Sequence, residues 1–140
     1  MLFLYLFLFP GGHAPMWGLP DNECTNKLIA QIYENNGVVC AVCHGTAGIV
    51  NLKTEDGKHL FADKSVSGYP DSFERQDAEY FKSFPFLIQE TIEKRGGEFQ
   101  FSPRNNPHVE VDGRLITGQN HLSSAAVAAE IIKLIQSNNF

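Results

Sequence analysis

Residues 38–45, Val-Val-Cys-Ala-Val-Cys-His-Gly, join an apolar segment to a cysteine–histidine pair that is followed by glycine. The first five residues are apolar and rich in valine, which favours a short buried strand. Gly45 and the small residues after it favour a turn into a helix. A strand that ends in a nucleophilic side chain and turns sharply into a helix forms a nucleophile elbow. We therefore predict that Cys43 lies at the carboxyl end of a strand, where open α/β sheets place their sites.

The same stretch contains a Cys-x-x-Cys spacing, which also occurs in redox and zinc sites. In a strand, however, Cys40 and Cys43 would point to opposite faces. The sequence has no second Cys-x-x-Cys and no His-x-x-x-His to complete a zinc site. We interpret Cys40 as a small buried side chain and expect neither a metal nor a cofactor. For Cys43 and His44, the residues alone leave two hypotheses open: a thiol beside its base, or a core cysteine beside a half-exposed histidine.

On the N-terminal side, the sequence alternates between apolar runs and helical spacing. Residues 2–9 form an apolar run that predicts a buried parallel strand, although a targeting segment would have a similar composition. An apolar stripe predicts a helix that begins after a cap at Asp21 or Asn22 and ends at Gly37. Together with the central strand and a predicted helix over residues 45–52, this order implies a parallel sheet with right-handed crossovers.

The C-terminal side is less regular, but it completes one α/β domain over residues 1–140. Residues 53–64 contain an Asp-Gly turn and predict a surface excursion. Strands are predicted from period-two alternation and helices from helical spacing of apolar residues. The predicted elements are a helix with Phe84, Leu87, Ile88 and Ile92 on one face, strands over residues 98–101, 108–111 and 114–117, and a last helix that begins at Ser123 or Ser124.

Composition excludes several classes of protein. The chain of 140 residues is 43% hydrophobic and 19% charged, as in ordinary globular proteins. Its net charge of -5, with dispersed lysines and arginines, provides no footprint for nucleic acid. No basic amphipathic helix is evident for a membrane surface. Three cysteines, without a disulfide-like spacing, favour a reducing compartment, so we expect a cytoplasmic protein, with the nucleus as a second location.

Four motifs occur in register along the chain: PGGHAPMWGLPDN at residues 10–22, IYENNGVVCAVCHGTAGIVNL at residues 32–52, VSGYPDSFE at residues 66–74 and NPHVEVDGRLITGQN at residues 106–120. Together they resemble the PfpI-like, or class I glutamine amidotransferase-like, superfamily, and within it the branch of heat-shock chaperones and glutathione-independent (type III) glyoxalases. The resemblance runs from about Tyr5 to the end of the chain and implies a flavodoxin-like three-layer sandwich with a mainly parallel sheet.

The resemblance also implies roles for individual residues. It makes Cys43 the nucleophile and His44 its partner, and it places the acid of the triad at Glu74, six positions beyond Gly68. On the residues alone, Glu74 could equally be a solvated carboxylate on a surface helix. The remaining implied positions are the backbone amides of Gly12 and His44 as an oxyanion hole, and Gly11, His13 and Trp17 as the substrate pocket.

The function implied by the resemblance is a cysteine-dependent, glutathione-independent glyoxalase that converts methylglyoxal to D-lactate without a metal. Its partner would be a small 2-oxoaldehyde, with neither nucleic acid nor a membrane involved, and family members frequently form homodimers. One alternative is a non-catalytic stress chaperone or redox sensor. A further alternative is a PfpI-type cysteine peptidase or amidotransferase-like hydrolase.

The sequence departs from the family pattern at Ala14, Gly18 and His121, where glycine, aspartate and proline are usual. A larger departure concerns the N-terminus. Relatives have several dozen residues before the Pro-Gly-Gly-His motif, including a glutamate that hydrogen-bonds the thiol and acts as acid and base. No acidic residue precedes Asp21 here. We therefore expect an N-terminally truncated domain with an exposed sheet edge and weak or absent activity.

Overall fold

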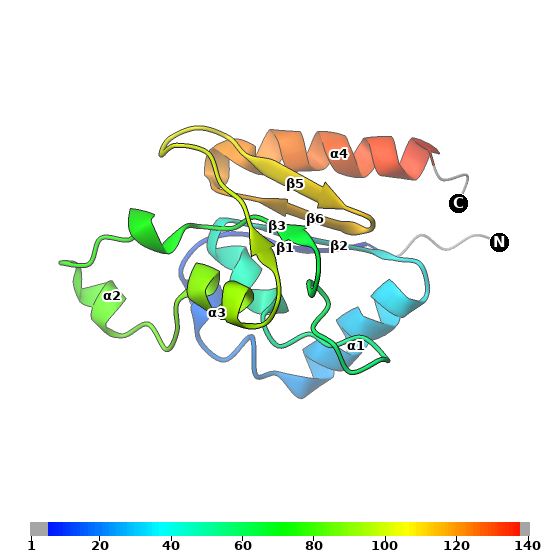
Figure 1. Ribbon diagram of the computed structural model, residues 1–140, viewed down its shortest axis with the longest axis horizontal. Helices are drawn as coiled ribbons and strands as arrows, with labels where there is room; N and C mark the ends of the chain where they lie inside the picture. Colours follow the sequence, from blue (N-terminus) through cyan, green and yellow to red (C-terminus); the bar gives the residue numbers. More distant parts are fainter. Residues whose placement is uncertain (1–5, 138–140) are drawn as a thin grey trace.

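The central element of the computed structural model, which describes residues 6–137, is a four-stranded sheet (Figure 1). Its strands, in spatial order, are β1 (Leu6–Phe9), β2 (Val38–Val42), β6 (Leu115–Gly118) and β5 (Val109–Asp112). The first three strands in this order are parallel, and β5 pairs antiparallel with β6. Residues 2–5 of the predicted first strand lie outside the described residues.

Helices cover both faces of this sheet and confirm the predicted three-layer sandwich. Figure 1 shows α1 (Glu23–Glu34) on one side and α4 (Ser124–Ser137) on the other. Since successive residues of a strand point to opposite faces, β2 contributes to both cores. Val39 packs in the cluster that includes Ile29 of α1, and Cys40 packs in the one that includes Val127 of α4. Every residue of β2 is buried, which explains its uninterrupted apolar sequence.

The boundaries of α1 follow the predicted signals. The Asn22 side chain accepts a hydrogen bond from the Thr25 amide at 2.9 Å and caps the first turn. After the helix ends, Asn36 adopts a positive φ of 64°, and the Gly37 amide donates to the carbonyl of Ile32 at 2.7 Å. The chain then enters β2 directly, so α1 and its caps fix where the strand that leads to Cys43 begins.

Two predicted elements differ from the observed ones. The segment after Cys43 is a 3₁₀ helix, η2 (Cys43–Ile49), which begins at the cysteine itself rather than at Gly45. The predicted helix that contains Phe84 is wrong, because Pro85 disfavours helical backbone at the residue before it. Instead, α2 (Glu79–Lys82) ends before Phe84, and α3 (Ile88–Lys94) begins after it.

Short elements complete the fold outside the main sheet. The strand predicted over residues 98–101 is shorter, β4 (Glu98–Phe99), and it pairs parallel with β3 (Ser65–Val66) in a separate two-stranded sheet, not with the main one. No helix within residues 6–137 is long and apolar enough to cross a membrane. The remaining short elements are the 3₁₀ helices η1 (Ala14–Met16), η3 (Asp71–Phe73) and η4 (His121–Ser123).

Close packing joins the end of β1 to the start of η2. A Cβ atom on Gly45 would lie 2.4 Å from the carbonyl oxygens of Phe9 and Pro10, and one on Gly48 would lie 2.4 Å from the Phe9 ring. Real Cβ atoms do not approach backbone oxygens this closely, so only glycine fits at residue 45. This contact holds the loop after β1 against the segment that contains Cys43.

We predict that Gly45→Ala lowers the free energy of unfolding by about 2–3 kcal/mol, because the added methyl group forces the backbone of β1 or η2 to move. Urea denaturation of the purified chain measures the change. Gly57→Ala is the control: its φ is 81°, but a Cβ there meets no atom within 4 Å. This control should cost only about 1 kcal/mol of backbone strain. Equal losses in the two variants would contradict the role of the Gly45 contact.

Candidate active site

Cys43 occupies a sharp turn at the carboxyl end of β2. Its φ is 60°, a left-handed backbone conformation that is uncommon for a residue other than glycine. Val42 before it is extended, and η2 begins at Cys43 itself. A Cβ on Gly11 would lie 3.0 Å from Cys43 Cβ and 3.7 Å from its Sγ, so the loop after β1 passes directly beside the thiol. This is the strained strand–turn–helix geometry that the sequence predicts for a nucleophile elbow.

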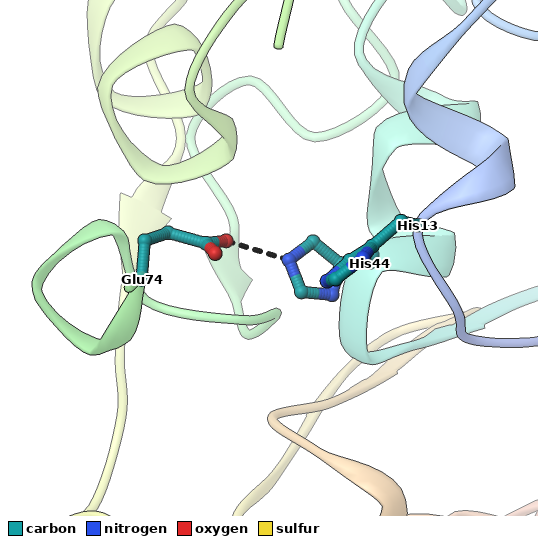
Figure 2. Close-up of side chains that lie close together, drawn as sticks. All are labelled: His13, His44 and Glu74. Atoms are coloured by element: carbon teal, nitrogen blue, oxygen red, sulfur yellow. Dashed lines mark hydrogen bonds and ion pairs between the residues drawn. The ribbon is translucent and has the colours of Figure 1, made fainter. Parts of the chain in front are cut away.

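A connected series of side chains leads from the thiol into the protein. Cys43 Sγ lies 3.5 Å from His44 Nδ1, and His44 Nε2 lies 2.6 Å from Glu74 Oε1. The side chains of His44 and Glu74 are 5% and 4% exposed. The structure therefore brings together the three residues proposed as a triad, and Glu74 is a buried partner of the imidazole rather than a solvated surface carboxylate. Figure 2 shows Glu74 and His44 pointing toward each other from separate segments.

The charge state of His44 follows from opposing effects. Burial lowers its pKa, but the hydrogen bonds and charge interactions with Cys43 and Glu74 outweigh burial and raise the pKa to about 9. For His13, burial and the nearby His44 lower the pKa, and the attraction of Glu74 only partly offsets them. The two rings meet edge to face, with centroids 4.6 Å apart. The site thus favours an imidazolium at His44 and a neutral imidazole at His13 near neutral pH.

Aromatic rings that were not predicted as site residues hold the two histidines in place. Tyr69 stacks on the His44 ring at a centroid distance of 4.4 Å, and Tyr80 stacks on His13 at 4.2 Å. Phe84 contacts both histidine rings at their edges. Tyr69 lies inside the Ser-Gly-Tyr motif that locates Glu74, so its presence near the site could have been inferred. Tyr80 and Phe84 lie in no such motif.

Gly12 and Trp17, the other residues predicted at the oxyanion hole and the substrate pocket, differ in their surroundings. Gly12 has a φ of 94°, and a Cβ there would meet no atom within 4 Å, so its backbone conformation rather than its size favours glycine. Trp17 is 42% exposed and packs against Phe84 at 5.4 Å. Its indole Nε1 donates to the Ser83 carbonyl at 3.1 Å. Trp17 and Met16 also line a surface cavity of about 330 Å³. Neither Cys43 nor His44 lines this cavity within the described part of the chain.

The other two cysteines have different surroundings. Cys40 is fully buried in β2, as predicted, and burial raises the pKa of its thiol to about 12. Cys24 is exposed on α1, and all three thiols are free. The Cys-x-x-Cys spacing therefore combines one core thiol with one partly exposed thiol at the turn.

Comparison with known proteins identifies the family. The model of the DJ-1/PfpI family matches residues 5–134. The chain belongs to the DJ-1/PfpI family. A DJ-1/PfpI relative from Schizosaccharomyces pombe, the probable glutathione-independent glyoxalase hsp3103, is 32% identical over 139 residues, which cover 93% of this chain and 52% of that protein. The glutathione-independent glyoxalase HSP31 of Saccharomyces cerevisiae is 30% identical, with 94% and 58% covered.

Solved structures support the same assignment. The crystal structure of glyoxalase III from Candida albicans superposes with a TM-score of 0.81 at 27% identity, covering 92% of this chain and 56% of the other. The DJ-1/PfpI chain described here thus spans about half the length of the relatives it matches. The flavodoxin-like fold predicted from the resemblance is confirmed.

We predict that stability depends on pH through His44. Because its pKa is higher in the folded chain than the ordinary value of 6.5, the folded state binds more protons between pH 6.5 and about 9. The stabilisation is complete below pH 6.5 and is lost as pH rises through about 9. Urea denaturation from pH 6 to 10 should show this decline in the parent chain and a shallower one in Glu74→Gln. Glu79→Gln, which removes an exposed carboxylate paired only with Lys82, is the control. A profile for Glu74→Gln identical to that of the control would contradict the coupling.

We also predict that iodoacetamide modifies Cys24 at least about 100-fold faster than Cys40 in the folded chain, because Cys40 is buried and its thiolate form is scarce at neutral pH. Peptide mass spectrometry after timed quenching measures both rates. After unfolding in urea, the two rates should become similar. Fast modification of Cys40 in the folded chain, or a disulfide between Cys40 and Cys43, would overturn this assignment.

Proposed function

We propose that this chain provides the cysteine centre of a glutathione-independent glyoxalase that acts on small 2-oxoaldehydes such as methylglyoxal. The observation that carries the proposal is the series Cys43–His44–Glu74 at the end of β2, with contacts of 3.5 and 2.6 Å. The names of relatives that are about 30% identical over most of this chain support the same reaction class. The chain spans about half the length of those proteins.

The first step is addition of the thiol to the substrate. The proton is held by His44, whose imidazolium lies 3.5 Å from the sulfur, so Cys43 reacts as the thiolate and its sulfur attacks the aldehyde carbon. A carbon–sulfur bond forms, and the electron pair of the C=O bond moves to oxygen, which gives a hemithioacetal. Glu74 stabilises the imidazolium and fixes the orientation of the ring. We assign the stabilisation of the developing oxyanion to the backbone amides of Gly12 and His44.

The second step moves a proton between the two carbons. The hydrogen on the thiol-bearing carbon leaves as a proton and produces an enediolate, and a proton is then added to the neighbouring carbon. The product is a thioester of 2-hydroxypropanoate, and water hydrolyses it to D-lactate and the free thiol. The net change is the addition of one water molecule, so the reaction needs no external oxidant or reductant.

The proton transfer between the two carbons requires a further general acid and base. According to the family resemblance, relatives use a glutamate from a more N-terminal segment as acid and base, and no acidic residue precedes Asp21 in these 140 residues. His44 and Glu74 already form a pair with each other. We therefore expect this chain by itself to turn over slowly, because loss of one general acid or base typically costs a factor of about 10²–10⁴.

The direct test is incubation of the purified chain with methylglyoxal, followed by enantiospecific measurement of D-lactate. Cys43→Ser should abolish turnover, and Glu74→Gln should lower it by about 10²-fold, since the imidazolium loses its buried partner. His121→Ala changes an exposed histidine outside the site and is the matched control. Turnover that survives Cys43→Ser would overturn the proposal.

A second hypothesis, a stress chaperone, has its own structural support. Leu6 and Leu8 point to the same face of the edge strand β1 and are 38% and 41% exposed, which provides apolar surface for an unfolded client. If D-lactate does not form, and both the parent chain and Cys43→Ser suppress aggregation of a client protein, the chaperone hypothesis replaces the glyoxalase.

A further inference from the structure

Three potential metal ligands converge at the candidate site from separate segments. His13 follows the glycine pair after β1, His44 follows the nucleophile, and Glu74 follows η3. One ligand atom from each residue can be chosen so that all three lie within 4.8 Å of one another. Figure 2 shows Glu74 pointing toward the His44 ring, with His13 on the other side of the close-up near His44. Because the three residues are far apart in the sequence, they form no metal-binding spacing motif, and no metal is predicted from the sequence.

The geometry of the His44–Glu74 pair needs little change to hold an ion. Nε2 and Oε1 are 2.6 Å apart and share one proton. Zinc bonds of about 2.0–2.2 Å in a tetrahedral arrangement would place the same two atoms roughly 3.3 Å apart. Replacing the proton by the ion thus requires the pair to open by less than about 1 Å, and the displaced proton goes to solvent.

The second oxygen of Glu74 is a further sign of an incomplete site. Oε2 is buried and has no hydrogen-bond partner among residues 6–137. A buried carboxylate oxygen without a donor is costly, since it has lost its hydration without a replacement. A cation bound at the carboxylate, or a water molecule in that cation's shell, would satisfy this oxygen.

His13 provides the adjustable third ligand. Its side chain is only partly buried, and its ring lies 4.6 Å from the His44 ring and stacks on Tyr80 at 4.2 Å, measured between ring centroids. It follows Gly12, whose positive φ places it in a turn of the loop. Two imidazoles and one carboxylate suit first-row transition metals such as zinc, whereas magnesium and calcium prefer oxygen ligands.

We propose that His13, His44 and Glu74 form an inhibitory binding site for a first-row divalent transition-metal ion. An ion on His44 Nε2 prevents the ring from carrying a second proton, and it takes the Glu74 carboxylate as a ligand, so His44 can no longer be the imidazolium that stabilises the Cys43 thiolate. Cys43 contacts Nδ1, the opposite nitrogen of the His44 ring, and is therefore not one of the three ligands. Metal binding does not depend on any enzymatic activity, and only the inhibition rests on the proposed glyoxalase function.

Metal binding is tested without substrate, using Zn²⁺ in isothermal titration calorimetry and Co²⁺ in visible absorption spectroscopy. The protein is the full chain with Cys24→Ser and Cys43→Ser, which removes both accessible thiols. We expect one equivalent of Zn²⁺ to bind and Co²⁺ to give an absorption spectrum typical of nitrogen and oxygen ligands. His13→Ala should weaken binding at least about 10-fold, as loss of even an outer-shell partner does. His121→Ala should leave it unchanged.

Side-chain ¹H–¹⁵N NMR spectra of the parent chain provide a measurement that does not depend on any variant folding. On addition of Zn²⁺, the imidazole resonances of His13 and His44 should shift together, and those of His121 should stay in place. Three results would overturn the proposal: binding that is unaffected by His13→Ala, binding that disappears when Cys43 is replaced, or shifts at His121 alone. Failure of the glyoxalase assay would leave these measurements unaffected.

Discussion

The left-handed backbone at Cys43 is the constraint on which the rest of the site depends. A residue other than glycine in this conformation costs about 1–3 kcal/mol, so the surrounding structure must supply at least that much. Packing on both sides of the turn provides this stabilisation. Behind it, β2 is buried in two cores at once, and beside it the backbone of Phe9 and Pro10 packs against Gly45 without space for a side chain. The packing of the sheet therefore fixes the position of the Cys43 thiol.

A second constraint, the buried His44–Glu74 pair, acts on charge rather than on backbone. An imidazole that is 5% exposed would normally lose its proton to burial, yet the thiol and the carboxylate reverse this tendency. The same pair explains why the proposed catalysis and the proposed metal site compete. Both need Nε2 and Oε1 close together: the shared proton holds them 2.6 Å apart, and a bound zinc ion would hold them roughly 3.3 Å apart. An arrangement that holds a proton tightly between two buried atoms also holds the atoms in position for a cation.

The sequence predicts this fold well wherever local signals agree with tertiary packing. The valine-rich strand, the Asn22 cap, the turn at Cys43 and the start of α4 are all found as predicted. The main failure has a local cause that the apolar spacing concealed. Phe84 has helical spacing with Ile88 and Ile92, but Pro85 disfavours helical backbone at Phe84, whose ring packs against both histidines instead.

The candidate site divides in the same way. Cys43 and His44 are adjacent, so a local pattern is enough to single them out. Glu74 is 30 residues away, and its own surroundings in the sequence are those of a surface residue. Only the family resemblance singled it out, and only the structure shows that it is buried. Tyr80 was not predicted at all, because a ring that stacks on His13 leaves no trace in the spacing of either segment.

The position of Trp17 makes its fluorescence sensitive to the candidate site. It is the single tryptophan of the chain, and its indole joins two segments that are 66 residues apart through the bond to Ser83. Its ring touches Phe84, which in turn touches both His13 and His44. The only strong intrinsic fluorophore of the molecule is thus one ring away from the thiol's partner. Its emission reports on movements of the candidate site without any added label, in the unmodified protein.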